Sequence, residues 1–585
     1  MTTARTTRRR WLVAAPALAA TVTLGLVLAG CGATPTAQQT AAAQTEATTE
    51  TTDLTGATDA TQTADDVLAA NQDTHDRADD AEYDTSDATT IALSGSTATV
   101  SGDGAETAGA TVVISSPGTY LLSGSYTGQI VVDSSAEGQV RLVLGGVDIA
   151  TDAGAAIDVR AADEAVVILA DGSENSLSDA SGYADDVAAN AALYSAADLT
   201  ITGSGSLTVA GNGNDGIASA DGLVIQSGTI SVTAVDDGIR GKGYLVIRGG
   251  ELTVDAGGDG LKADNDTEAE RGYVWIAGGS ARVTSGDDGV AAATDVVTTG
   301  GEVAITAGGG ASGNPDDGAK GVSAGVIAVF AGGSLTVDAA DDAVNTNAYA
   351  HVDGAALTLA SGDDGVHAEL QLVISSGAVT VSRAYEGLEG AQITIAGGDT
   401  TLTTSDDGVN VSQPDSGSGA QTLVISGGTL LVDAGGDGLD VNAGTLTMSG
   451  GTVVVNGPTR SDNGALDVDA GMTISGGSFL AVGSSGMAMA PSADSAQASV
   501  QFALSQTVAA GTELSIVDAS GAVVATFTIT KQVQNVVFSD AAIANGQTYT
   551  LTSGGSTVGS AVAGEQTSSE MGGPGGMGGG GGGRP

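Results

Sequence analysis

The chain contains few cysteines, prolines and aromatic residues. Its 585 residues include 1 cysteine and 9 prolines, and 3% of them are aromatic. A single cysteine cannot form a disulfide within the chain, so something other than disulfides must stabilise the fold. Because aromatic side chains are scarce, the core must be built in layers from Val, Ile, Leu and Ala.

Basic residues are also scarce. The sequence has 18 Lys and Arg against 70 Asp and Glu, which gives a formal net charge of -52 at pH 7. Nucleic acids and anionic membranes repel such a chain unless cations intervene. We therefore expect no nucleic-acid partner.

The N-terminal residues predict secretion and lipid anchoring. Arginines at 8–10 are followed by an apolar run at 11–28 and then by Leu28-Ala29-Gly30-Cys31. Basic, apolar and small-residue regions in this order are typical of a secretory signal. The last four residues resemble the bacterial lipobox, which implies that Cys31 carries lipid and holds the protein on the extracellular face of the bacterial cell membrane. A transmembrane anchor with an incidental cysteine is the alternative, and both Sec and twin-arginine export stay open.

The central region lacks helix-length apolar periodicity and repeats a short phrase instead. Asp-Asp-Gly followed by an apolar residue, or a close variant, recurs every 21–30 residues. The copies begin at Asn214, Asp236, Gly258, Asp287, Asp316, Asp341, Asp363, Tyr385, Asp406, Gly436 and Asp462. A fixed short period predicts a solenoid. Between copies, short alternating apolar segments are separated by glycines, which favours an all-β parallel β-helix with three strands per coil.

The sequence divides into five segments. They are a lipoprotein signal peptide (1–31), a disordered Thr/Ala/Asp-rich tether (32–84), a parallel β-helix domain (85–495), a small C-terminal β cap (496–556) and a disordered Gly-rich tail (557–585). The tether has almost no large apolar residues, which predicts flexibility. The cap is expected because a solenoid needs a cover for its open end.

Several stretches resemble one protein family. GTYLLSGSYTGQIVV (118–132), NAALYSAADLTITGSGSLTV (190–209), the repeated phrase and the C-terminal module are similar to the carbohydrate-binding family of secreted, polysaccharide-lyase-like right-handed parallel β-helices. The resemblance covers about residues 85–555. It implies a right-handed helix, binding of cellulosic or acidic polysaccharides, bound calcium and no established catalysis.

The aspartates of the phrase predict a calcium-binding ladder. Coils stack about 4.8 Å apart, and two carboxylates at that distance repel each other by about 3.5 kcal/mol at an effective dielectric of 20. Calcium would relieve this repulsion, since it accepts several oxygen ligands in flexible geometry. Alternatively, the second aspartate accepts hydrogen bonds from nearby amides, and the first is a solvated charge. The candidate ligands are Asp236, Asp237, Asp259, Asp287, Asp288, Asp316, Asp317, Asp341, Asp342, Asp363, Asp364, Asp406 and Asp407.

Residues at equal offsets from the repeated aspartate form columns along the stack. The apolar residue two positions later predicts a core column of Ile217, Ile239, Leu261, Val290, Ala319, Val344, Val366, Leu388, Val409 and Leu439. The next residue must then face solvent because strands alternate. Arg240, Lys262, Lys320 and His367 are in this second column, which is therefore a candidate ligand face.

An aromatic patch is the best candidate for holding a sugar. Val274 and Ile276 align with inward residues one coil earlier, so Tyr273 and Trp275 should point outward, with Tyr244 beside Tyr273. Aromatic faces surrounded by polar groups suit sugar rings. The candidate ligand-binding residues are Arg240, Lys242, Tyr244, Lys262, Arg271, Tyr273, Trp275, Lys320 and His367.

Binding of a polysaccharide by a lipid-anchored surface protein is the leading hypothesis. The first alternative is a calcium-dependent polysaccharide lyase, in which Arg240, Lys262 or Lys320 would take a proton from a uronate. A hydrolase with paired carboxylates is another, and a structural stalk or adhesin that binds no sugar is a third. The sequence favours binding over catalysis, because no basic residue lies in a dense cluster that is unique to one coil.

Overall fold

A computed structural model describes residues 57–184, 187–414, 417 and 419–565. All of these residues belong to one compact unit. The predicted signal peptide and Cys31 lie outside the described residues. In the part of the chain that is described, no helix has both the length and the apolar character needed to span a bilayer.

Strands make up nearly all of the regular structure. The helical elements are α1 (Ala64–Ala70) and the 3₁₀ turn η1 (Pro315–Asp317). The first strands are β1 (Thr89–Gly95), β2 (Thr97–Ser101), β3 (Ala105–Ala108), β4 (Thr111–Ile114), β5 (Gly118–Thr127), β6 (Gln129–Asp133), β7 (Gln139–Ala150), β8 (Ile157–Ala161), β9 (Glu164–Leu169) and β10 (Glu174–Ser178). The pairs β1–β2 and β3–β4 are antiparallel, whereas β5 and β7 already pair in parallel.

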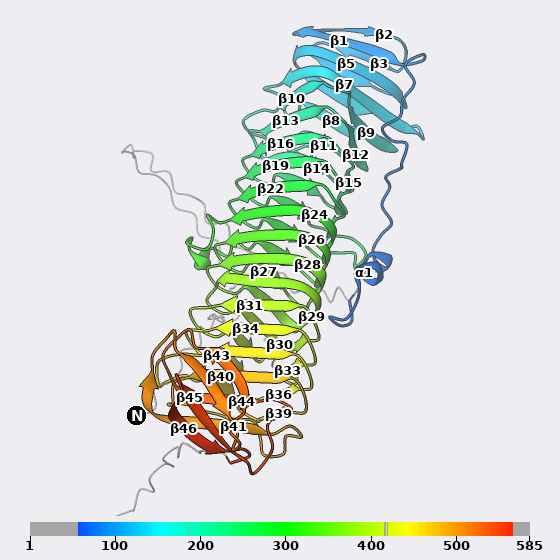
Figure 1. Cartoon of the computed structure of the whole chain (residues 1–585). Helices are drawn as coiled ribbons and strands as arrows, with labels where there is room; N and C mark the ends of the chain where they lie inside the picture. The colour runs from blue at the N-terminus through cyan, green and yellow to red at the C-terminus, as the bar shows by residue number, and fades with distance from the viewer. Residues whose placement is uncertain (1–56, 185–186, 415–416, 418, 566–585) are drawn as a thin grey trace, which may run out of the picture. The chain divides into compact units, whose positions relative to one another are not determined.

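The next strands repeat in groups of three. They are β11 (Ala191–Ser195), β12 (Leu199–Gly203), β13 (Ser206–Gly211), β14 (Asp215–Ser219), β15 (Gly222–Ile225), β16 (Thr229–Ala234), β17 (Ile239–Gly241), β18 (Tyr244–Ile247), β19 (Glu251–Ala256), β20 (Leu261–Ala263), β21 (Tyr273–Ile276), β22 (Ser280–Ser285) and β23 (Val290–Ala292). We call each passage of the chain around the core a rung. Each strand from β11 to β21 pairs in parallel with the strand three places later, as in β11–β14–β17–β20, so the rungs stack in register (Figure 1).

Beyond these rungs, long strands replace pairs of short ones. They are β24 (Asp295–Ala307), β25 (Val322–Ala324), β26 (Ile327–Ala339), β27 (Val344–Thr346), β28 (Tyr349–Ser361), β29 (Val366–Arg383) and β30 (Leu388–Ile395). Short strands then return as β31 (Asp399–Thr403), β32 (Val409–Val411), β33 (Thr422–Ile425), β34 (Thr429–Asp433), β35 (Leu439–Val441), β36 (Thr445–Met448), β37 (Thr452–Asn456), β38 (Leu466–Val468), β39 (Met472–Ile474) and β40 (Ser478–Gly483).

The fold class predicted from the sequence needs correction. The protein is all-β, but its strands form one mostly parallel sheet of 42 strands that closes around a single core, and further strands lie outside this sheet. β24 pairs with both β21 and β22, because the chain bends at Gly300 and Gly301 without leaving the ladder. An open right-handed β-helix with three strands in every coil is therefore the wrong description.

The core column is confirmed at nine of its ten positions. Ile217, Ile239, Leu261 and Val290 are successive partners in register, and all of them are buried in the same core. The exception is Ala319, because Val290 pairs with Val322 instead. The insertion 308–318, which contains η1, carries a second Asp-Asp-Gly and so imitates the repeated phrase.

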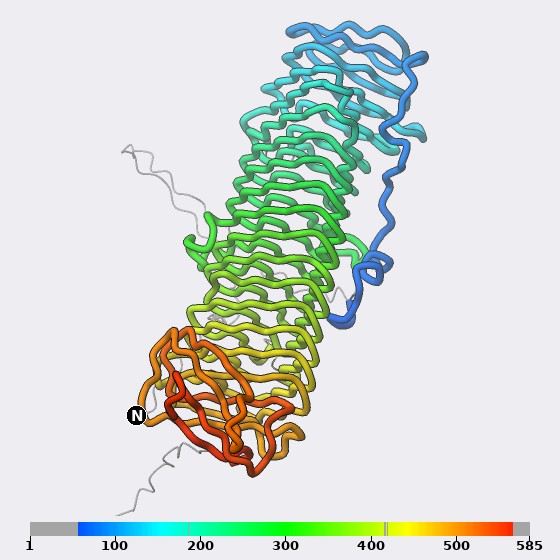
Figure 2. Tube along the Cα trace, in the orientation of Figure 1, coloured from blue at the N-terminus to red at the C-terminus, as the bar shows by residue number. Residues whose placement is uncertain are grey.

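The segment predicted to be a flexible tether is ordered from residue 57 onward. Residues 57–80, which we call the strap, lie along the outside of the rungs, with α1 beside β24 and β26 (Figures 1 and 2). Thr63 and Asp66 form a capping box at the start of α1. Val67 of the helix packs in one cluster with Val297 and Ile327 of the wall. The prediction failed because a few small apolar residues suffice when the wall supplies the rest of the apolar surface.

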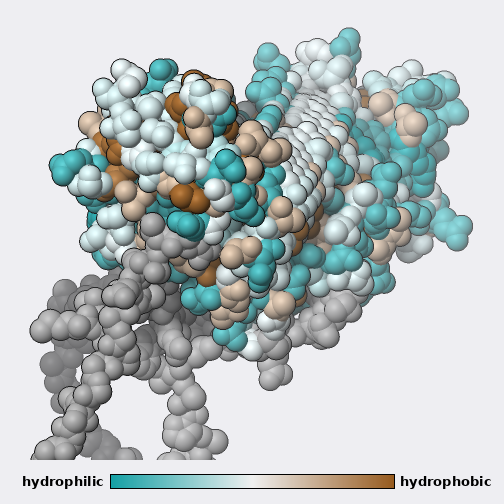
Figure 3. Space-filling model, turned by 60° about the horizontal axis from the view of Figure 1, so that its bottom comes forward, coloured by the Kyte–Doolittle hydropathy of each residue, from teal (hydrophilic) through white to brown (hydrophobic). Residues whose placement is uncertain are grey.

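The C-terminal strands form an antiparallel module. They are β41 (Ser499–Val508), β42 (Glu513–Val517), β43 (Val523–Thr528), β44 (Val533–Ser539), β45 (Thr548–Ser553) and β46 (Ser556–Val562). β44 pairs with both β40 and β41, while β43, β42, β45 and β46 form a separate sheet over a second core. β46 extends past the predicted end of the cap at 556. In Figure 3, which brings this module forward, scattered apolar surface lies over it. Val523 of β43 is exposed.

Candidate functional site

The second acidic residue of the phrase bonds each rung to the next. The backbone N–H of Asp259 donates to Oδ1 of Asp237 at 3.0 Å, and that of Asp288 donates to Oδ1 of Asp259 at 3.0 Å. The same bond joins Asp364 to Asp342 and, further along, Asp437 to Asp407. These carboxylates therefore accept hydrogen bonds from backbone amides. This is the role that the alternative to a calcium ladder predicts.

Basic side chains offset much of the repulsion between these carboxylates. Nζ of Lys262 lies 3.0 Å from Oδ2 of Asp237 and 2.8 Å from Oδ2 of Asp259. Burial alone lowers the pKa of Lys262, but the two carboxylates more than compensate, so its pKa is raised above the ordinary value. The guanidinium of Arg240 donates two hydrogen bonds to Asp264 and lies 3.6 Å from Asp215. These basic side chains point away from the core as predicted, but they form ion pairs within the protein.

Lys320 lies in a different column from the predicted one. Its backbone N–H donates to Oδ1 of Asp288 at 2.7 Å, so it occupies the position of a second aspartate, and Ser323 takes the expected outward position. Its Nζ donates to Asp341 at 3.0 Å. Asp316 and Asp317 lie in η1 of the insertion, and the structure does not bring them into the ladder.

His367 sits among the acidic side chains of Asp342, Asp364, Glu369 and Glu389. Nδ1 lies 3.6 Å from Oδ2 of Asp364 and 3.7 Å from Oε2 of Glu389, while Nε2 lies 3.7 Å from Oε2 of Glu369. Burial alone would lower the pKa of His367, but the neighbouring carboxylates raise it by more, so that its pKa is about 9. The imidazole is therefore charged at neutral pH, which makes it a poor metal ligand and a good counter-ion.

Four groups of side chains in the described residues are close enough to hold a cation. They are Asp259, Asp287 and Asp288; Asp341, Asp342 and Asp363; Asp364, His367 and Glu389; and Asp407, Asp437 and Asp440. Asp236, Asp237 and Asp406 are predicted ligands that lie outside these groups. In the last group all three carboxylates are buried, with ligand atoms within 4.8 Å of one another. Burial and then the charges of Asp440 and Asp437 raise the pKa of Asp407 to about 8.

The predicted aromatic patch is largely covered. Tyr244 and Tyr273 point away from the core, as alternation requires, and their rings stack with centroids 5.3 Å apart. The strap lies over them, however, and leaves them 0% and 1% exposed. The hydroxyl of Tyr273 donates to the carbonyl of Gln72 at 2.8 Å. These two tyrosines therefore cannot serve as an open platform for sugar while the strap is in place.

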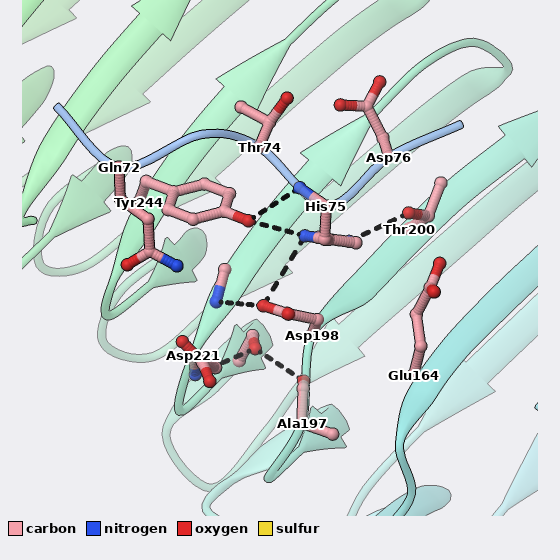
Figure 4. Close-up of polar contacts among 12 residues, drawn as sticks. Gln72, Thr74, His75, Asp76, Glu164, Ala197, Asp198, Thr200, Asp221 and Tyr244 are labelled. Atoms are coloured by element: carbon pink, nitrogen blue, oxygen red, sulfur yellow. Dashed lines mark hydrogen bonds and ion pairs between the residues drawn. The ribbon is translucent and has the colours of Figure 1, made fainter. Parts of the chain in front are cut away.

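His75 fixes the strap above Tyr244 (Figure 4). Its backbone N–H donates to the hydroxyl of Tyr244 at 3.0 Å, and Nδ1 lies 2.7 Å from the same oxygen. Nε2 lies 3.0 Å from Oγ1 of Thr200, and Nδ1 lies 3.5 Å from Oδ1 of Asp198. Burial raises the pKa of Asp198 despite the nearby His75. The sequence did not predict a role for His75. The capping-box pattern at Thr63–Asp66 is the signal that could have shown that the strap is ordered.

The remaining patch residues differ in their accessibility. Trp275 is partly exposed, and the guanidinium carbon of Arg248 lies 4.3 Å from its ring centroid. Asp76 of the strap holds that guanidinium. Arg271 is paired with Asp221, whereas Lys242 is exposed. The structure thus brings Tyr244, Tyr273 and Trp275 together, but it uses most of the predicted ligand residues for internal contacts.

Two comparisons with known proteins give descriptions that name a carbohydrate-binding domain. Residues 108–365 match the family described as carbohydrate-binding domain-containing protein. The chain is similar to carbohydrate-binding domain proteins. A curated relative of that description, from Acetivibrio thermocellus, is 37% identical over 137 residues, which are 23% of this chain and 48% of the relative. The chain therefore spans about half the length of that curated relative.

One solved structure also matches. It is described as a polysaccharide lyase-like protein from C. thermocellum, in a gadolinium derivative. It is 36% identical, with a TM-score of 0.37, and the match covers 38% of this chain and 92% of that chain.

Proposed function

We propose that this protein binds a polysaccharide along the exposed wall of its stacked rungs. The similarity of residues 108–365 to carbohydrate-binding domain proteins carries the proposal. The geometry supports it, because polar side chains recur on the outer wall once per rung, about 4.8 Å apart. Asn345, His367, Glu389 and Asn410 are successive, partly exposed members of this row. A polymer with repeating hydroxyl groups can bond to such a row along its length.

A panel of soluble polysaccharides tests this function. We expect neutral, cellulose-like chains to bind with or without calcium, and polygalacturonate to bind only with calcium, because a protein with a net charge of -52 repels an anionic polymer. Isothermal titration calorimetry in calcium and in EDTA at equal ionic strength measures both. A chain that binds no member of the panel in either buffer would be a structural stalk.

We also propose calcium at the group formed by Asp407, Asp437 and Asp440. Three buried carboxylates with converging oxygens match the ligands that calcium prefers. The raised pKa of Asp407 supports this site, since a cation would offset both the burial and the repulsion that keep its proton bound.

No catalytic step is proposed. A base that takes a proton from a uronate must be neutral at the working pH. The pKa values of Arg240, Lys262 and Lys320 are all raised; burial opposes the increase, and neighbouring carboxylates cause it. The three candidate bases of the lyase hypothesis thus stay protonated.

The protein is proposed to be lipid-anchored at Cys31. Cys31→Ser should therefore move the protein from the membrane fraction to the medium, or leave it unprocessed. Detergent-phase partitioning of the wild type and the variant measures this. Equal partitioning of both would show that another segment anchors the chain.

A further inference from the structure

A groove with a volume of about 300 Å³ opens on the wall, and no residue of the strap lines it. It crosses three successive rungs at the turn that follows β28, β29 and β31. Its lining includes Ser361, Arg383, Tyr385, Thr403 and Ser405. The groove begins where the family match at residues 108–365 ends, so neither the match nor the repeat analysis assigns a role to it.

Tyr385 is the unusual residue of this groove. It occupies the first position of the repeated phrase, where the rungs before and after it have Asp363 and Asp406. Backbone hydrogen bonds hold it in register, with its N–H donating to the carbonyl of Asp363 at 2.7 Å. The side chain is 40% exposed, in a chain where aromatic residues are few. The fold therefore presents an aromatic ring at a place where the two neighbouring rungs have a carboxylate.

The groups around this ring are suited to hydroxyl ligands. A hydrogen bond to Asp406 fixes the hydroxyl of Tyr385 and raises its pKa. Arg383 is exposed, and its Nη1 donates to Oγ of Ser312 in the insertion at 3.1 Å. Oγ of the exposed Ser405 donates to the backbone carbonyl of Ala384, which leaves its lone pairs to accept hydrogen bonds.

We propose that this groove is a subsite for a neutral saccharide, which stacks on Tyr385 and bonds to Arg383 and the hydroxyl of Ser405. The proposal rests on the proposed function, because it locates part of the polysaccharide contact. An amphipathic ring beside convergent polar groups in a concave site is the arrangement that binds such ligands. A neutral sugar is favoured over a uronate because Asp406 and Glu386 adjoin the groove and are acidic.

Calorimetry with cellohexaose and with the polysaccharides that the wild type binds tests this subsite. Tyr385→Ala should weaken binding roughly 3- to 12-fold, the loss of one aromatic contact. Tyr385→Phe should keep most of the affinity, and Arg383→Ala should reduce it. The matched control is Tyr83→Ala, which removes another exposed tyrosine, 39% exposed and outside the groove. Melting temperatures should stay equal among all variants.

The outcomes separate the subsite from the proposed function. If the wild type binds saccharide and Tyr385→Ala binds it equally well, the subsite is wrong and the function stands. If the wild type binds no saccharide at all, both proposals are wrong. If Tyr83→Ala weakens binding as much as Tyr385→Ala does, the ligand does not depend on the groove.

Discussion

In the absence of calcium, the free energy of unfolding should fall as the pH rises from about 4 to about 7. Burial, followed by the charge of Asp237, raises the pKa of Asp215 to about 7 in the folded protein, against about 3.9 in an unfolded chain. Between these two values the folded state binds more protons than the unfolded state, so raising the pH favours unfolding. For this one buried group the loss is on the order of 4 kcal/mol. Asp288, with a pKa of about 7, adds to it.

His367 extends the same trend to higher pH. Its folded pKa of about 9 exceeds the unfolded value of about 6.5, so its contribution is complete below pH 6.5 and is lost as the pH rises through 9. Urea unfolding in EDTA at pH 5, 7 and 9 measures both contributions. Asp215→Asn should flatten the decline below pH 7 and leave the decline above pH 7 unchanged. A stability maximum at neutral pH in the wild type would contradict this expectation.

At pH 8, calcium should restore part of the free energy of unfolding that is lost as the pH rises. At a calcium concentration a hundredfold above the dissociation constant, one site adds about 2.7 kcal/mol. Asp407→Asn should abolish this gain if the ion lies between Asp407, Asp437 and Asp440. Equal stabilisation of the wild type and Asp407→Asn would place the ion elsewhere, and no stabilisation of either would refute calcium binding.

The period of the phrase predicted the core well, because one residue type at one offset suffices to define a buried column. Ile239 and Leu261 stack as expected. The same reasoning failed at Ala319, since the insertion repeats the letters of the phrase, and only the pairing of Val322 with Val290 shows the true register. Sequence pattern defines the spacing of rungs, but strand pairing decides which copy belongs to the ladder.

The strap could not be predicted from its own composition. Its order depends on residues far away in the sequence, such as Asp295, whose Oδ2 accepts a hydrogen bond from Asn71 at 2.8 Å. The position of the Tyr244 ring beneath the strap also depends on a distant residue. Gly222 pairs with Tyr244, and a side chain at Gly222 would meet the tyrosine ring. Alternation predicted correctly that Tyr244 and Tyr273 leave the core. It could not show that another part of the chain covers them.

Replacing Tyr244 with alanine should release the strap around His75 and cost about 3–5 kcal/mol of unfolding free energy. The ring is fully buried, it stacks on Tyr273, and its hydroxyl makes two of the hydrogen bonds that hold His75. Removing it leaves a cavity beneath the strap and leaves the backbone N–H of His75 without its acceptor. Limited proteolysis should then cut the chain between residues 57 and 84, where the wild type is protected.

Two control variants separate the effect of losing the ring of Tyr244 from the effect of losing its hydroxyl and from the effect of removing any tyrosine. Tyr244→Phe keeps the stacked ring and loses only the hydroxyl, so it should cost about 1–3 kcal/mol and loosen the strap only near His75. Tyr83→Ala removes an exposed ring and should change the stability by less than about 0.5 kcal/mol. Because Val67 and Asn71 also hold the strap against the wall, its helix should stay bound in Tyr244→Ala while residues 72–77 open. Hydrogen exchange confined to 72–77 would show that opening, and full protection of the strap in Tyr244→Ala would show that His75 and Tyr244 do not hold it.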